Sequence, residues 1–364
     1  MTDRYAPLRE IARTLGVDAV ALVPGSNFTR IMGHAFLSFE RPLLVVVPVE
    51  GPPAAIVPNL ELASWDEVGF EGETFDWRDQ TGHAPAFAAL AAHMPLRSLA
   101  VEGQVMRVFV HHALVQAMPG LRVVDAEREI SGLRLCKTPD EIAALEQAIR
   151  ISEAALEEVL QDLKAGQSEK DVERRLVQAM FGHGAEALAF TPIVAAGANS
   201  AQPHASARAD YAIRPGDALL FDFGAVYGGL TADITRTVFV GHAPDEAQQV
   251  YATVLAANRK GHEVAGPGVS AHDVDDAVTG VLEASPFAEY IRTKTGHGLG
   301  REVHEAPYIM RGNHQLLQPG MVFTDEPGLY LLGRVGVRIE DDILITGDGC
   351  RSLTTFPKEL RIVG

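Results

Sequence analysis

The chain has 364 residues, of which 47% are hydrophobic and 22% charged, and its formal net charge is −17. This is the composition of a globular protein with room for two domains, and the strong negative charge argues against nonspecific binding to nucleic acid or acidic membranes. Neither a membrane span nor the apolar core of a signal peptide is recognisable, and two cysteines are too few for a disulfide framework, so the cytoplasm is the expected compartment.

Residues 1–130 predict a small α/β domain. Helical spacing of apolar residues over 5–15 is followed by short apolar runs that predict strands at 19–23, 43–47 and 54–57. The last two runs are joined by Gly51-Pro52-Pro53, which favours an antiparallel pair. Helices at 86–94 and 106–118 should alternate with strands at 98–102 and 121–125. No cluster of histidines or carboxylates stands in these strands, so we expect a supporting or oligomer-forming role.

Residues 131–364 predict a second domain made of two similar halves. Thr138-Pro139-Asp140-Glu141 is a capping box that opens a helix reaching about residue 163, and Ser168 caps a second helix. Pro244-Asp245-Glu246 repeats the first of these helix starts and Ser270 the second, roughly a hundred residues later. A hairpin opened by Pro-Gly follows in each half. We therefore expect an internal duplication folded around a pseudo-twofold axis.

The first hairpin carries two aspartates in apolar surroundings. Asp222 and Asp233 stand in two apolar runs joined at Tyr227-Gly228-Gly229. The midpoint between the aspartates falls at residues 227–228, which predicts that they face each other across the hairpin. A carboxylate in such a strand costs several kcal/mol to desolvate unless something compensates its charge. A bound metal ion would compensate both.

The second hairpin offers another carboxylate pair. An ungapped alignment of residues 215–224 with 319–328 places Glu326 at the position of Asp222, and Glu340 lies on the return strand with Gly333 at the midpoint. Between the hairpins, His297 is flanked by glycines that let the backbone approach closely. Four carboxylates and one imidazole suit two divalent cations with shared carboxylates, and an oxygen-rich set without thiolates favours Mn²⁺, with Co²⁺, Fe²⁺ or Zn²⁺ as alternatives.

The order Asp222, Asp233, His297, Glu326, Glu340 resembles that of the pita-bread metallopeptidases, which include methionine aminopeptidase, aminopeptidase P and prolidase. Residues 192–204 are similar to the segment with that family's first active-site histidine, and residues 39–47 to the creatinase/prolidase N-terminal domain, which methionine aminopeptidases lack. The resemblance implies an α+β protein, with a pita-bread catalytic domain at 131–364 after a smaller creatinase-like domain at 1–130. It also implies a homodimer.

The resemblance further implies roles for individual residues. All five residues of the pattern would be metal ligands, with Asp233 and Glu340 bridging. Glu326 would also shuttle the proton of the attacking water. His304 would steady the scissile carbonyl and the developing oxyanion, and His204 would lie near the proline side.

Other residues are interpreted from their position alone. Arg338 stands two residues before Glu340, so it shares a strand face with Glu340 and can orient the carboxylates. Arg301 follows the glycine-rich histidine loop and is a candidate for capturing a substrate carboxylate, and a residue from the N-terminal domain of a partner subunit is the alternative. Asp325 alternates to the opposite strand face and is not expected to be a ligand. The remaining histidines are interpreted as structural: His34, His83, His93, His111, His112, His183, His242, His262, His272 and His314.

The resemblance implies hydrolysis of the bond before proline, and the expected substrates are Xaa-Pro dipeptides. That bond is a tertiary amide without an N–H, so a preformed slot suits it better than recognition as a strand. Three alternatives stay open: an aminopeptidase P acting on longer peptides, a creatinase-like small-amide hydrolase, and a binding module without catalysis. The complete set of ligand types disfavours the last two.

Overall fold

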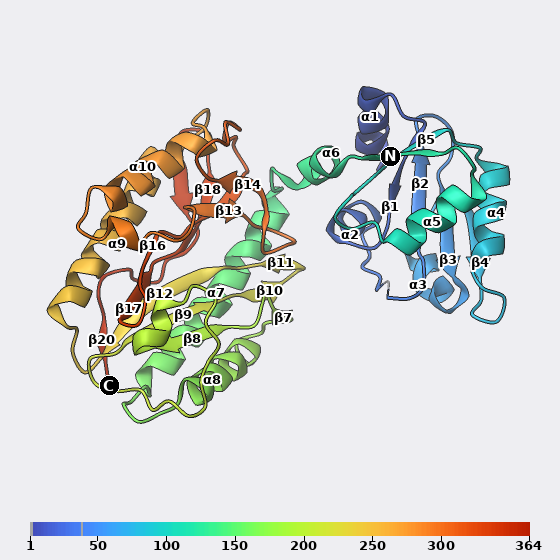
Figure 1. Cartoon of the computed structure of the whole chain (residues 1–364). Coiled ribbons are helices and arrows are strands. Elements are labelled where there is room, and N and C mark those ends of the chain that lie inside the picture. The colour runs from blue at the N-terminus through green and yellow to red at the C-terminus, as the bar shows by residue number, and fades with distance from the viewer. Residues whose placement is uncertain (1–2, 38) are drawn as a thin grey trace. The chain divides into compact units, whose positions relative to one another are not determined.

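The structure is a computed structural model that describes residues 3–37 and 39–364. It divides into two compact units, Met1–Arg134 and Leu135–Gly364. Both units combine helices with sheets (Figure 1), in agreement with the predicted α+β class. Among the described residues, no helix is long and apolar enough to cross a membrane.

The N-terminal unit is a six-stranded sheet with helices. The strand order is β4-β3-β2-β1-β5-β6, and β2 pairs antiparallel with β3, as the Gly-Pro-Pro turn predicts. The strands are β1 (Ala19–Leu22), β2 (Leu44–Pro48), β3 (Ala54–Pro58), β4 (Glu73–Trp77), β5 (Ser98–Val101) and β6 (Arg122–Asp125). The helices are α1 (Ala6–Leu15), α2 (Ser26–Met32), α3 (Leu62–Glu67), α4 (Ala84–His93), α5 (Val108–Ala117) and α6 (Glu127–Ser131), with 3-10 turns η1 (Asn59–Glu61) and η2 (Gly132–Arg134).

Three helices and one strand of this unit were not predicted: α2, α3, α6 and β4. All three helices are shorter than two full turns, and β4 is only half-buried, so the apolar periodicity of all four is weak.

The C-terminal unit contains two helix pairs, and in Figure 1 α9 lies beside α10. The pairs are α7 (Pro139–Gln161) with α8 (Glu169–Gly182), and α9 (Asp245–Val264) with α10 (Ala271–Glu283), followed by the 3-10 turn η4 (Ala288–Tyr290). The predicted capping box at Thr138 is present, and the side chains of Ser168 and Ser270 cap α8 and α10 through the backbone N–H three residues on.

The loops before α8 and α10 show that the two halves are built alike. The Gly166 N–H donates to the Ile213 carbonyl at 2.8 Å, and the Gly268 N–H donates to the Leu317 carbonyl at the same distance. The two capping serines also form equivalent single-residue antiparallel β-bridges, Ser168 with Ala212 and Ser270 with Leu316. The predicted duplication is thus visible in backbone hydrogen bonds as well as in helix order.

Two sheets carry the hairpins. The first has the order β20-β12-β9-β8 and the second β14-β13-β15-β18-β19, while β16 pairs with β17 and β10 with β7 and β11. The strands are β7 (Ala187–Leu188), β8 (Ile193–Ala196), β9 (Ala218–Phe223), β10 (Ala225–Tyr227), β11 (Leu230–Thr231), β12 (Ile234–Val240), β13 (Gly296–Gly298), β14 (Glu305–Ile309), β15 (Val322–Asp325), β16 (Gly328–Leu331), β17 (Val335–Arg338), β18 (Asp341–Ile345), β19 (Cys350–Ser352) and β20 (Ile362–Val363); the 3-10 turn η3 (Gly197–Ala201) follows β8.

The register of the first hairpin differs from the prediction by two residues. Asp222 pairs with Thr235, and the turn is centred on Gly228 and Gly229, whose φ angles are 58° and 71°. A two-residue hairpin turn with positive φ at both central positions selects a Gly-Gly pair, so the turn moves one residue beyond the predicted midpoint. The prediction that Asp222 and Asp233 face each other was therefore wrong, and the two aspartates are diagonal neighbours.

The second hairpin has the predicted register. Gly328 pairs with Arg338 and Asp325 with Asp341, so Glu326 and Glu340 stand opposite each other between these pairs. The two hairpins meet where the Glu340 N–H donates to the Thr235 carbonyl at 3.1 Å. This contact brings the carboxylate pairs of both halves to one centre.

Candidate metal centre and active site

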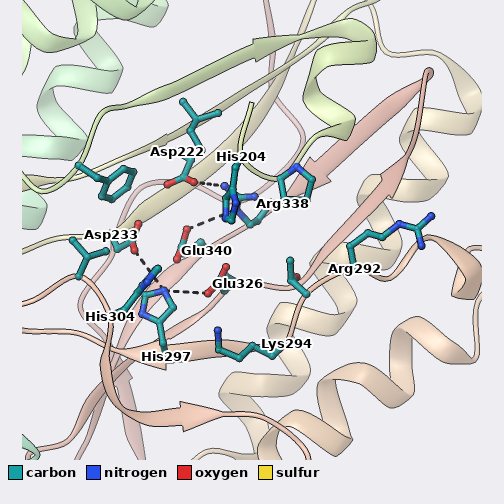
Figure 2. A pocket seen from close by; sticks show the side chains of 15 residues that line it. His204, Asp222, Asp233, Arg292, Lys294, His297, His304, Glu326, Arg338 and Glu340 are labelled. Carbon is teal, nitrogen blue, oxygen red and sulfur yellow. Dashed lines mark hydrogen bonds and ion pairs between the residues drawn. The ribbon is translucent and has the colours of Figure 1, made fainter. Parts of the chain in front are cut away.

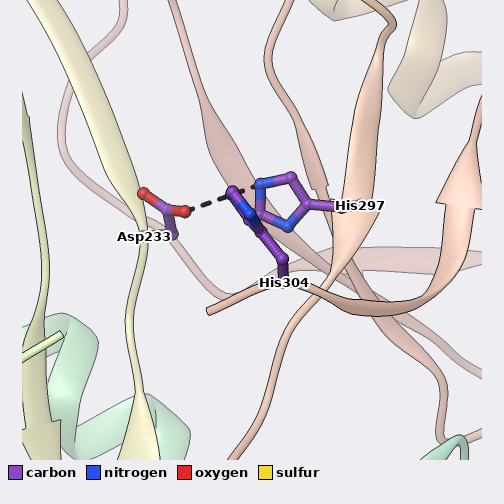
Figure 3. Close-up of side chains that lie close together, drawn as sticks. All are labelled: Asp233, His297 and His304. Carbon is purple, nitrogen blue, oxygen red and sulfur yellow. Dashed lines mark ion pairs between the residues drawn. The ribbon is translucent and has the colours of Figure 1, made fainter. Parts of the chain in front are cut away.

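The five predicted ligands converge in one pocket of the C-terminal unit (Figure 2). Ligand atoms of Asp222, Asp233 and Glu340 lie within 4.8 Å of one another, and so do those of His297, Glu326 and Glu340. Glu340 belongs to both groups. A third group joins Asp233 with His297 and His304 (Figure 3). The arrangement matches two neighbouring cation positions with a shared carboxylate.

Close backbone packing explains the glycines beside His297. A Cβ at residue 296 would lie 1.7 Å from the Thr324 carbonyl oxygen, and one at residue 298 would lie 2.2 Å from the Ala306 oxygen. Only glycine lets β13 approach its two neighbours so closely. The predicted close approach is confirmed, and it holds the imidazole rigidly above the carboxylates.

The imidazole of His297 presents a lone pair to the carboxylates. Its Nδ1 lies 3.2 Å from the Gly298 carbonyl oxygen, which can only accept, so Nδ1 carries the proton. Nε2 lies 3.3 Å from Glu326 Oε1 and 3.7 Å from Asp233 Oδ2. Burial lowers the pKa of His297 to about 3, which keeps the ring neutral. Acceptor atoms that face one another at these distances need a proton or a cation between them.

The carboxylates form a buried cluster whose negative charges repel one another. Burial, reinforced by the charges of Glu340 and Asp222, raises the pKa of Asp233 well above its ordinary value. Burial likewise raises the pKa of Asp222 and Glu340, and that of Glu326 to about 7. Asp222 Oδ1 is buried without a hydrogen-bond partner. Unpaired buried oxygens and repelling carboxylates are what a divalent cation would relieve, so these residues fit the metal pair that the sequence predicts.

Arg338 contacts one of the predicted ligands directly and another through a threonine. Its guanidinium pairs with Asp222 Oδ2, while Nη1 donates to Tyr330 Oη at 2.8 Å and Nε to Thr235 Oγ1 at 2.9 Å. The Thr235 hydroxyl in turn donates to Glu340 Oε2 at 2.5 Å. The side chain of Arg338 is 4% exposed. One buried cation thus fixes carboxylates from both hairpins.

Three supporting residues were missed by the sequence reasoning: Thr235, Thr324 and Asp342. The Thr324 hydroxyl accepts from the His297 N–H at 3.1 Å and donates to Glu326 Oε1 at 3.2 Å, and Asp342 Oδ2 accepts from the Asp233 N–H at 3.2 Å. Threonines are ordinary strand residues, so nothing in their type or spacing distinguishes these two in the sequence. Asp342 stands in the acidic run 340–342, a signal that could have been pursued.

The two other predicted histidines, His204 and His304, line the same pocket. His204 follows η3, and His304 lies in the turn between β13 and β14 with its ring centroid 4.1 Å from that of His297. Both are exposed, and burial of part of the ring lowers the pKa of His304. The pocket has a volume of about 630 Å³, and its apolar wall is formed by Phe190, Ile193, Pro203 and Val303.

Arg301 does not reach this pocket. Its Nη2 lies 3.3 Å from Glu141 Oε1 on α7, and it is absent from the pocket lining. The interpretation of Arg301 as a clamp for a substrate carboxylate was therefore wrong, because the ion pair with α7 directs the guanidinium elsewhere. Two cations that the sequence reasoning passed over, Arg292 and Lys294, line the pocket instead.

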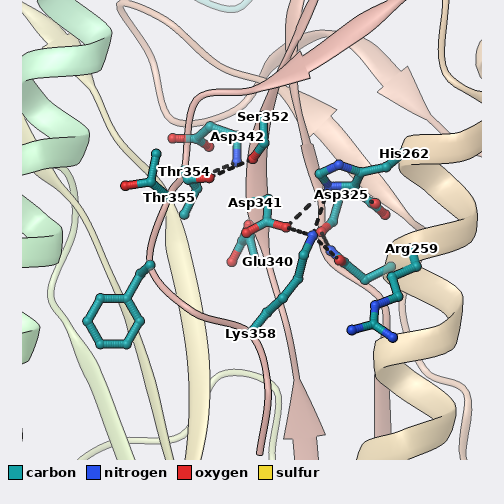
Figure 4. A network of polar contacts seen from close by, with 12 residues as sticks. Arg259, His262, Asp325, Glu340, Asp341, Asp342, Ser352, Thr354, Thr355 and Lys358 are labelled. Carbon is teal, nitrogen blue, oxygen red and sulfur yellow. Dashed lines mark hydrogen bonds and ion pairs between the residues drawn. The ribbon is translucent and has the colours of Figure 1, made fainter.

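Asp325 belongs to a separate buried network (Figure 4). Its Oδ2 lies 3.8 Å from His262 Nε2, and the same nitrogen lies 3.2 Å from Asp341 Oδ2. Lys358 Nζ donates to Asp341 Oδ2 at 2.7 Å. Asp325 and Asp341 thus face α9 while their neighbours Glu326 and Glu340 face the pocket, as strand alternation predicts.

Comparison with known proteins gives the family. Residues 143–347 match Metallopeptidase family M24, and residues 4–136 match the Creatinase/Prolidase N-terminal domain. The chain belongs to metallopeptidase family M24. This M24 chain is 34% identical to the probable dipeptidase PepE of Mycobacterium tuberculosis (strain ATCC 25618 / H37Rv) over 96% of its own length and 92% of the relative's.

Two further relatives are similar to this chain over nearly its full length. The M24 chain is 32% identical to the Xaa-Pro dipeptidase of Pyrococcus horikoshii, with 99% of each chain covered. The crystal structure of a prolidase from Thermococcus sibiricus superposes with a TM-score of 0.92 at 33% identity, with 100% of each chain covered. The predicted family and fold are confirmed, and the chain is a metallopeptidase of two domains.

Proposed function

We propose that this M24 chain is an Xaa-Pro dipeptidase that uses two divalent metal ions, with Mn²⁺ as the preferred metal. The observation that carries the proposal is the convergence of Asp222, Asp233, His297, Glu326 and Glu340 in one pocket that also contains His204 and His304. A donor set of four carboxylates and one imidazole, without thiolates, supports Mn²⁺. The relatives named as Xaa-Pro dipeptidases support the substrate class.

The residues of the pocket have separable tasks. When bound, the cations supply the Lewis acidity that makes water a nucleophile near neutral pH. Glu326 takes the proton of that water and passes it to the leaving amine. His304 donates to the scissile carbonyl oxygen as negative charge develops there, and Arg338 keeps Asp222 in place throughout.

The shape of the pocket supports cleavage before proline. Phe190, Ile193, Pro203 and Val303 contribute apolar lining that suits a pyrrolidine ring, and His204 lines the same pocket. The amide before proline has no N–H, so it needs no acceptor in the site. A pocket with histidines around the carbonyl and an apolar wall for the ring therefore satisfies the groups that such a substrate presents.

The test is hydrolysis of Leu-Pro beside Leu-Pro-Pro after chelation and after return of Mn²⁺, Co²⁺ or Zn²⁺. The proposal predicts that the chelated protein is inactive and that Mn²⁺ restores cleavage of Leu-Pro ahead of the tripeptide. Preferential cleavage of Leu-Pro-Pro would make the protein an aminopeptidase P. Cleavage of neither peptide with any metal would contradict peptidase activity on proline bonds and favour a small-amide substrate.

We further propose a homodimer located in the cytoplasm. The N-terminal unit exposes large apolar side chains, which supports a role in pairing: Leu37, Phe39, Leu60 and Val108 are 58–75% exposed. Cys136 and Cys350 are free thiols, which suits a reducing compartment. Light scattering coupled to gel filtration tests the dimer, and a mass of 39.1 kDa would contradict it.

A further inference from the structure

Two cations in the pocket have no ionic partner among the residues that the structure describes. Arg292 and Lys294 precede β13 and line the pocket, and neither forms a hydrogen bond or ion pair with any residue that the structure describes. Both side chains are exposed. The third cation of the pocket, Arg338, is fully engaged with Asp222, Tyr330 and Thr235. Acidic side chains outnumber basic ones in this chain, whose net charge is −17, so two basic side chains without an acidic partner in the pocket are unexpected.

Lys294 is the nearer of the two to the ligands. Figure 2 shows its amino end directed toward Glu326 and His297, whereas Arg292 extends away from the carboxylates. Burial lowers the pKa of His304 and raises that of Glu326; the charge of Lys294 adds to the first effect and opposes the second, so the ammonium lies within electrostatic reach of both side chains. Lys294 Nζ also lies 5.8 Å from the centroid of the Tyr308 ring, a cation–π contact that supplies no anionic partner.

We propose that Lys294 binds the free carboxylate of a dipeptide substrate and that Arg292 attracts this carboxylate from the edge of the pocket. The inference rests on the proposed function, because it concerns the residue that follows the cleaved bond. In a dipeptide that residue ends in a carboxylate a few ångströms beyond the scissile amide. In a longer peptide the same position holds a neutral amide, which leaves the ammonium without a counter-ion.

This assignment gives the pocket a physical basis for measuring substrate length. A charge-assisted hydrogen bond in a partly desolvated site discriminates strongly between a carboxylate and an amide of nearly equal size. Lys294 would act on binding of the substrate and not on the reacting atoms, so its loss should appear mainly in KM. A lysine that stabilised the oxyanion would instead lower kcat for every substrate.

The experiment compares Leu-Pro with Leu-Pro-amide in the Mn²⁺-loaded protein. For the wild type we expect a KM for Leu-Pro at least tenfold lower than that for the amide. Lys294→Gln should raise the KM for Leu-Pro by about 10- to 100-fold, the range for losing one charge-assisted hydrogen bond, and should change the KM for the amide by less than about twofold. Lys294→Arg should restore most of the preference, and Arg292→Gln should have a smaller effect of the same kind.

Lys164→Gln is the matched control, because Lys164 is an exposed lysine outside the pocket and its removal changes the net charge equally. Equal loss for Leu-Pro and Leu-Pro-amide in Lys294→Gln would overturn the assignment, as would a wild type that does not distinguish them. Either result would leave the proposed peptidase intact. A wild type that cleaves neither compound would overturn the peptidase itself and this inference with it.

Discussion

A buried ion pair fixes the loop that carries His304, and breaking it should destabilise the C-terminal unit. Lys137 Nζ lies 2.6 Å from Glu305 Oε1, and the two side chains are 2% and 3% exposed. Gly300 packs against the pair, since a Cβ there would lie 2.8 Å from Glu305 Oε1. Lys137→Met removes the ammonium and leaves the Glu305 carboxylate buried without that partner.

The cost of leaving one member of such a pair is about 3–5 kcal/mol, and full burial means that solvent does not screen it. For a unit of about this size, each kcal/mol shifts Tm by about 2–4 °C, so Lys137→Met should lower Tm by about 6–20 °C. The double variant Lys137→Met/Glu305→Leu removes both charges and should recover most of this loss, because an apolar pair of similar volume replaces the ion pair.

The assay is thermal and urea unfolding of the wild type, both single variants and the double variant, all metal-free at one pH. A double variant as unstable as the sum of the single variants would refute the reasoning, because the two side chains would then act independently. A loss below about 1 kcal/mol in Lys137→Met would refute the buried-pair magnitude.

Three further outcomes are expected. The pKa values of the site carboxyls are raised, to about 7 for Glu326, so the folded metal-free protein keeps protons that the unfolded chain has already lost at the same pH. The free energy of unfolding, measured by urea titration, should therefore fall as pH rises from about 4.5 to 7, and an increase over this range would contradict the prediction. Mn²⁺ binding should release protons, seen as buffer-dependent heats in calorimetry, and heats independent of the buffer would argue against it. Gly298→Ala should lower Tm and kcat together, because its Cβ would lie 2.2 Å from the Ala306 oxygen, whereas Gly347→Ala, in open space, should change neither.

Sequence reasoning succeeded where residue type and chain geometry point the same way. The apolar hairpins, the capped helix starts and their recurrence predicted both halves of the C-terminal unit. Alternation along the strand correctly separated Asp325 from Glu326, because side chains on successive residues point to opposite faces. The symmetric turn at Gly333 likewise gave the correct pairing of Glu326 with Glu340.

Sequence reasoning failed where contacts between distant elements or the exact turn geometry determine the position of a side chain. The two-residue error at Asp222 and Asp233 came from placing the turn by symmetry, although Gly228-Gly229 carries the stronger signal for a turn with two positive φ angles. Arg301 was misplaced because its partner Glu141 lies 160 residues earlier on a different element. Arg292 and Lys294 were overlooked because an isolated basic residue in a loop looks like any solvated surface charge.

The most direct test of the central claim is a titration of the chelated protein with Mn²⁺ while Leu-Pro hydrolysis and bound metal are measured together. The account predicts that activity appears only with bound metal and reaches its maximum at two ions per chain. It also predicts that Asp233→Asn, which removes the charge of one predicted bridging carboxylate, lowers both the amount of metal bound and kcat. Full hydrolysis of Leu-Pro in the presence of chelator, or saturation of activity at one ion in both proteins, would contradict it.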